Sequence, residues 1–198
     1  MFLNKTRFKK MLKSAYNYGG LTVGRIYGGL VLSGNGWVSW TEEGYIPNWL
    51  KAAIMELTGE LPRVECVYTA QKDEVLQFEI AENDHLNLPE RFAEARIPFY
   101  VTPIEYSTNW AEYRMLQNKQ NGVIVALPSG YFDVLDFTEL DKEEHAPAGP
   151  VSQSEAADRM YWKNEHSAVA FSTAKTGNAI CTKTMDLIKE INFGEKVS

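Results

Sequence analysis

The chain has 198 residues, of which 44% are hydrophobic and 12% aromatic, and its formal net charge is −6 at pH 7. A chain of this size can bury most of the apolar surface that its unfolded form exposes, so we expect a single domain over residues 1–198. No apolar stretch is long enough to cross a bilayer, and two cysteines are too few for a disulfide framework. We therefore expect a cytoplasmic protein that does not contact a membrane.

The charge is divided unevenly along the chain. The first 41 residues contain no acidic side chain, whereas residues 42–198 carry all 26 acids and a net charge of −12. A basic segment favours phosphate or acidic surfaces, while an acidic body favours basic partners. The six bases of the first segment are Lys5, Arg7, Lys9, Lys10, Lys13 and Arg25.

The first third of the chain predicts a helix, a strand meander and a second helix. Residues 4–18 place apolar side chains at helical spacing, with lysines on the other face. Three β-branched or aromatic runs follow at 21–27, 30–33 and 37–40, and glycine turns separate them. Residues 46–57 repeat the helical spacing, with a proline near the start and a glycine after the end.

The middle of the chain predicts a hairpin and an edge strand. Residues 63–70 and 74–81 have strand composition on either side of a polar turn. A polar loop at 82–88 leads to a short helix at 89–95. Residues 97–106 have strand composition but contain two prolines, which favours the edge of a sheet.

The next segment predicts a helix followed by another hairpin. Asn109 and Glu112 have the spacing of a helix N-terminus, so we expect a helix over residues 110–119. A proline and a glycine lie between the strand-like runs 123–127 and 131–138, which predicts a turn there.

The last quarter begins with an acidic loop. Residues 139–151 combine acids with prolines and a glycine, and this loop is the one weak candidate for a domain boundary. A capping-box pattern predicts a helix over residues 152–163. A short strand at 168–172 and a final amphipathic helix from residue 180 complete the chain.

These elements define an α+β fold class. The strands form antiparallel hairpins and a meander, and we expect about four to six helices to pack on the resulting sheet. The regular alternation of strand and helix that builds a parallel sheet is missing from the pattern.

The first functional hypothesis is a non-catalytic protein-interaction module. Surface carboxylates would engage a basic or nucleic-acid-binding protein, as in an acidic inhibitor or decoy of the phage or mobile-element type. The partner would be another protein with a basic surface. The candidate acidic patch consists of Asp141, Glu143, Glu144, Glu42 and Glu43.

The first alternative is a small hydrolase with a histidine and carboxylate site that the fold assembles. Each histidine of the chain follows an acid directly, at His85, His145 and His166. Neighbouring side chains point in different directions, so these dipeptides do not build a metal site by themselves. We assign no catalytic residue, no metal ligand and no cofactor from the sequence.

The second alternative is nucleic-acid binding through the basic N-terminal helix and the aromatic meander. Lysine and arginine would contact phosphates while an aromatic ring stacks on a base. The overall acidity of the chain argues against this function. The candidate face consists of Lys9, Lys10, Lys13, Arg25, Tyr27 and Trp37.

Overall fold

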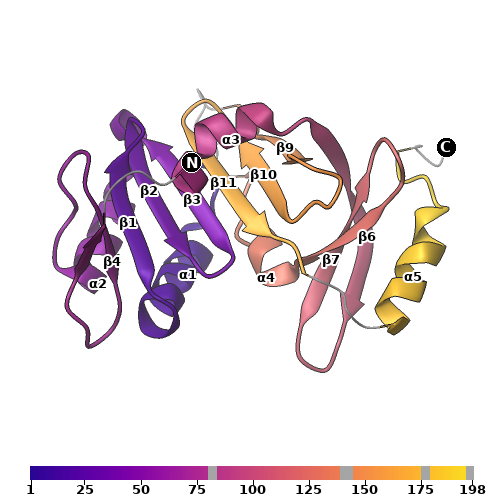
Figure 1. The fold of residues 1–198 in the computed structure, drawn as a ribbon, viewed down its shortest axis with the longest axis horizontal. Helices are drawn as coiled ribbons and strands as arrows, with labels where there is room; N and C mark the ends of the chain where they lie inside the picture. The colour runs from indigo at the N-terminus through magenta and orange to yellow at the C-terminus, as the bar shows by residue number, and fades with distance from the viewer. Residues whose placement is uncertain (80–83, 139–144, 175–178, 195–198) are drawn as a thin grey trace.

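The computed structural model describes residues 1–79, 84–138, 145–174 and 179–194, and they form an α+β fold around an antiparallel sheet (Figure 1). The strand order is β5-β4-β1-β2-β3-β11-β10-β9-β6-β7-β8. In chain order the strands are β1 (Leu21–Ile26), β2 (Gly29–Gly34), β3 (Trp37–Glu42), β4 (Val67–Ala70), β5 (Gln77–Glu79), β6 (Ile97–Ser107), β7 (Glu112–Asn118), β8 (Ile124–Pro128), β9 (Ala148–Ser152), β10 (Arg159–Lys163) and β11 (Ser167–Ser172).

Five α-helices and two short 3-10 helices accompany the sheet in the described residues. Figure 1 shows α3 beside β10 and β11, and α5 at the far end of the sheet. The α-helices are α1 (Lys5–Tyr18), α2 (Asn48–Thr58), α3 (Leu88–Glu94), α4 (Ser129–Phe132) and α5 (Ala179–Lys189), and the 3-10 helices are η1 (Glu43–Tyr45) and η2 (Asp84–Leu86). None of the described helices combines the length and apolar character that a bilayer crossing needs.

The first helix and the meander form as the sequence predicts. The side chain of Asn4 caps α1 by accepting a hydrogen bond from the backbone N–H of Arg7 at 3.1 Å. A two-residue turn joins β1 to β2, and both of its residues, Tyr27 and Gly28, have positive φ. Two-residue hairpin turns with this backbone match the twist of the strands, which fixes the register of the pair.

Apolar side chains on the two faces of the sheet belong to two different cores. In β11, Val169 and Phe171 belong to the larger core together with Phe8 of α1 and Leu50 of α2. Ala168 and its neighbours on the same face of β11 belong to a second core. This alternation follows from the two-residue period of a strand, and it buries β11 on both faces.

Two predicted helices are strands in the structure. The segment 110–119 contains β7, which pairs with both β6 and β8. The segment 152–163 contains β10, which pairs with β9 and β11. Polar residues that cap helices also stabilise turns. In the β6–β7 turn the hydroxyl of Thr108 accepts hydrogen bonds from the backbone N–H groups of Trp110 at 3.2 Å and Ala111 at 3.0 Å.

Three smaller predictions also need correction. β6 lies inside the sheet, between β9 and β7, rather than at its edge. Its pairing with β7 shifts register between Val101 and Glu105, and this irregularity accommodates Pro103. The run 131–138 begins within the short helix α4 and contains no named strand. The loop 139–151 includes the start of β9, which pairs with β10. Residues 80–83 and 139–144 of the predicted hairpin and loop lie outside the described part.

Phe8 tests how much of the stability depends on the packing of α1. Its ring is fully buried, 5.6 Å from the ring of Trp37 and 6.4 Å from that of Trp49. We expect Phe8→Ala to lower the free energy of unfolding by about 3–5 kcal/mol, because it leaves a cavity between α1, β3 and α2. Urea denaturation measures this change. Tyr18→Ala, at an exposed position of the same helix, should change the stability little, and equal losses in the two variants would contradict this packing.

Candidate functional site

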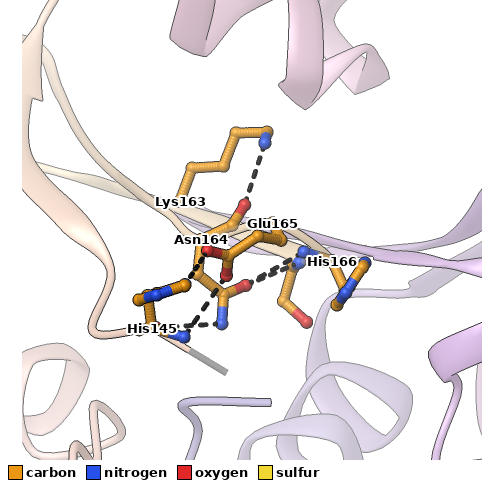
Figure 2. Close-up of polar contacts among 6 residues, drawn as sticks. His145, Lys163, Asn164, Glu165 and His166 are labelled. Carbon is orange, nitrogen blue, oxygen red and sulfur yellow. Dashed lines mark hydrogen bonds and ion pairs between the residues drawn. The ribbon is translucent and has the colours of Figure 1, made fainter. Parts of the chain in front are cut away.

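The turn between β10 and β11 contains His166, and His145, which lies before β9 in the chain, contacts the same turn. Asn164 shapes this turn, because its side-chain oxygen accepts hydrogen bonds from the backbone N–H groups of His166 at 3.2 Å and Ser167 at 2.9 Å. Asparagine favours such turns because its side chain replaces a backbone acceptor. Figure 2 shows Asn164 at the centre of the turn, with the side chains of His145 and His166 on either side of it.

His166 contacts the end of β3. Its Nδ1 lies 2.6 Å from a carboxylate oxygen of Glu42, and its carbonyl accepts a hydrogen bond from the backbone N–H of Glu42 at 2.9 Å. The ring of Tyr45 stacks on the imidazole with a centroid distance of 3.3 Å and an interplanar angle of 7°. The imidazole is therefore held on one ring nitrogen and on one face.

His145 contacts the opposite side of the same turn. Its Nδ1 lies 2.5 Å from a carboxylate oxygen of Glu165, and its backbone N–H donates to the other oxygen at 3.4 Å (Figure 2). The pKa of Glu165 lies below its ordinary value, mainly because the carboxylate accepts a hydrogen bond from its own backbone N–H and also because of His145. Hydrogen bonds to the charged form of a carboxylate stabilise that form.

The chemistry of this turn follows from those contacts. A carboxylate at one ring nitrogen orients an imidazole and leaves the other nitrogen to exchange a proton, as in a general base. Ser167 is a poor nucleophile for such a base, because it is 2% exposed and its hydroxyl is enclosed. In the described residues, no group of three His, Cys, Asp or Glu side chains could hold a metal ion. His85 lies apart on η2 and is exposed.

Two of the predicted acidic residues have basic or imidazole partners. Glu43 receives two hydrogen bonds from the Arg25 guanidinium, at 2.5 Å and 3.3 Å, and Glu42 contacts His166. Arg25 and Glu43 were predicted for opposite kinds of surface, and in the structure they bind each other. The other acidic candidates, Asp141, Glu143 and Glu144, lie outside the described residues.

The predicted basic and aromatic face is divided between several places. Lys10 and Lys13 are exposed on α1 and Lys9 is half-buried there. Trp37 is 4% exposed, and its ring belongs to the larger core. Tyr27 packs against the second core at the β1–β2 turn. The structure therefore places these two aromatic rings in cores rather than on one exposed face with the lysines.

The sequence analysis predicted a strand at residues 74–81, which contains β5, but not that this strand lies at the end of the sheet. We call residues 73–78 the open edge, because β5 is the last strand at its end of the sheet and has only β4 as a neighbour in the described residues. Val75 is 87% exposed and Phe78 is 67% exposed. At the other end of the sheet, Ala174 forms a bridge to Ala126 of β8. In the sequence, the apolar residues that directly follow two acids within 73–78 were the feature that could have indicated this exposed surface.

Comparisons of the chain with protein-family models, with curated proteins and with solved structures give no match. Function is therefore inferred from the contacts, burial and charges described above.

The turn predicts a measurable pH response at Glu165. Because its pKa is lowered on folding, its contribution to stability is present above the ordinary glutamate pKa and is lost as the pH falls through the lowered value. We expect His145→Ala to raise the pKa of Glu165 only part of the way to its ordinary value, because the bond from its own N–H remains. Carbon-13 NMR titration of the carboxyl group measures both values. An unchanged pKa in the variant would contradict the contact.

Proposed function

We propose that this protein is a non-catalytic protein-interaction module whose partner has a basic surface, and that the open edge forms part of its binding surface. The exposure of Val75 and Phe78 at a strand whose outer edge has no partner among the described residues is the observation that carries the proposal. An unpaired strand edge presents backbone N–H and C=O groups that an extended segment of another chain can pair with. Exposed apolar side chains beside such an edge add contact area.

The charge of the open edge supports a basic partner. Asp73 and Glu74 are exposed and directly precede Val75, and neither has an ion pair with a described residue. Residues 42–198 have a net charge of −12, so the field of the whole body adds to this local charge. Complementary charge speeds the encounter of two proteins and selects among partners.

The finer form of the proposal is an acidic inhibitor or decoy that occupies a nucleic-acid-binding protein. Its support is the excess of acids after residue 41, which gives this part of the chain a negative charge. A nucleic-acid backbone has the same sign of charge, and the likeness extends no further. Asp141, Glu143 and Glu144 remain proposed members of the acidic surface. Glu42 and Glu43 contribute less to it, because His166 and Arg25 bind their carboxylates.

Charge reversal at the open edge tests the proposal. Once a basic partner protein has been captured, we expect the double variant Asp73→Lys, Glu74→Lys to lower its association rate with that partner about tenfold. The reason is that the substitutions reverse the local electric field. The matched control is Asp186→Lys, Glu190→Lys, which reverses two exposed acids near the other end of the sheet. Surface plasmon resonance at low salt and at ~0.5 M salt measures the rates.

The apolar part of the open edge has its own test. Val75→Ser should increase the dissociation rate while the charge stays constant, because Val75 is largely exposed and contributes little to folding. If the double variant at residues 73 and 74 and the control double variant at residues 186 and 190 lower the association rate equally, the binding depends on overall charge and not on the open edge. No loss in either open-edge variant would remove this surface from the proposal.

A second candidate function is a hydrolase that uses the turn between β10 and β11. The observation that favours it is the pair of histidine–carboxylate contacts on one turn, with Glu42 and Glu165 as the two acids. The stacked ring of Tyr45 and the enclosed hydroxyl of Ser167 count against it. The contacts of His166 instead support a role in joining the end of β3 to the turn.

His166→Ala separates these two functions. For the interaction module we expect unchanged partner binding and a loss of about 1 kcal/mol in the free energy of unfolding, because one hydrogen bond and one ring contact disappear. For a hydrolase we expect turnover of an ester or phosphoester panel to fall at least about a hundredfold. His145→Ala is the matched variant on the other side of the turn. If the unmodified protein turns over a substrate and both variants abolish that turnover, the non-catalytic proposal is overturned.

A further inference from the structure

A cleft of about 710 Å³ lies between α1 and the segment 128–134. One wall comes from α1 and the other from the end of β8 and α4. Its size falls within the range of small-molecule sites in proteins. The lining residues used below are Thr6, Arg7, Lys10, Met11, Ser14, Tyr131 and Val134.

A second cleft of about 230 Å³ adjoins the first one and shares Met11, Ser14 and Tyr131 with it. The ring of Trp37 and the backbone turn at Asn35 border this smaller cleft. The two clefts therefore form one surface depression along α1, and we call it the α1 cleft.

The charged residues that line the α1 cleft are basic. Arg7 and Lys10 line it, and neither cleft has an acidic residue in its lining. The Arg7 guanidinium is held in place by Asp133, which leaves other N–H groups of the fork for a ligand. Lys10 has no hydrogen bond or ion pair with any described residue, so its ammonium group is exposed without a compensating acid among them.

The floor of the α1 cleft is apolar and fixed. The ring of Tyr131 stacks on Phe171 with a centroid distance of 5.2 Å and an interplanar angle of 9°. Its hydroxyl donates to the carbonyl of Asn35 at 2.8 Å, and burial raises its pKa, so the phenol stays neutral. Met11 and Val134 add aliphatic contacts. A cleft with an aromatic floor and a cationic rim suits a ligand with the same two parts.

We propose that the α1 cleft binds a small organic anion, whose ring lies against Tyr131 and Met11 and whose phosphate or carboxylate group contacts Lys10 and Arg7. The hydroxyl groups of Thr6 and Ser14 lie in the same lining and can donate further hydrogen bonds to the anionic group. This site shares no lining residue with the open edge, and it goes beyond the proposed interaction function.

The helix supplies its own matched control. Lys13 is exposed on α1, as Lys10 is, but it does not line either cleft. Replacing either lysine by glutamine removes one charge from the same helix, so the two variants have the same net charge. Only a ligand inside the cleft distinguishes between them.

Isothermal titration calorimetry with naphthyl phosphate, naphthoate and naphthol tests the site. The three probes share one ring system and carry a phosphate, a carboxylate or no charged group. We expect at least one anion to bind more tightly than naphthol, and Lys10→Gln to weaken the binding of that anion about tenfold, as expected for the loss of a charged hydrogen bond. The dissociation constant of Lys13→Gln should lie within about twofold of that of the unmodified protein.

The two anions distinguish the kind of group that the cleft prefers. Tighter binding of naphthyl phosphate assigns the site to phosphate-bearing ligands, and tighter binding of naphthoate assigns it to carboxylates. Equal affinity for all three probes, or equal weakening in the two lysine variants, would overturn the proposal. Partner capture through the open edge should be unchanged in Lys10→Gln, so the two proposals fail or succeed independently.

Discussion

The pairing of β3 with β11 is the contact on which the rest of the structure depends. In the strand order, five described strands from β5 to β3 lie on one side of β11, and five from β10 to β8 lie on the other. The register runs from Thr41 opposite Ser167 to Trp37 opposite Phe171. Because both strands are buried on both faces, this pairing makes each of the two cores continuous across the two halves of the sheet.

The contacts at the β10–β11 turn have a structural explanation in this pairing. Glu42 is the last residue of β3 and His166 directly precedes β11, so the antiparallel register brings them to the same end. The carboxylate–imidazole contact then lies beside the last backbone hydrogen bonds of the pair. A similar logic explains Arg25 and Glu43, which meet because β1, β2 and β3 form a meander.

The sequence predicts those parts of the fold whose pattern and final environment agree. The helices α1 and α2 have apolar stripes that pack into the larger core, so periodicity alone is sufficient to find them. β7 and β10 were mistaken for helices because polar residues before each strand resemble helix caps, and only their neighbours in the sheet decide the outcome. The sequence could not show that Glu43 is paired with Arg25, because that contact depends on a strand register that no local pattern contains.

The central position of β11 has a consequence for synthesis on the ribosome. Ser167 follows its partner Thr41 by 126 residues, so β3 has no neighbour on one side for about 6–25 s at ~5–20 residues per second. During that time a strand rich in Trp37, Val38 and Trp40 exposes an unpaired edge, which favours association between nascent chains. The last described strand in the chain, β11, is thus the one that ends this exposure.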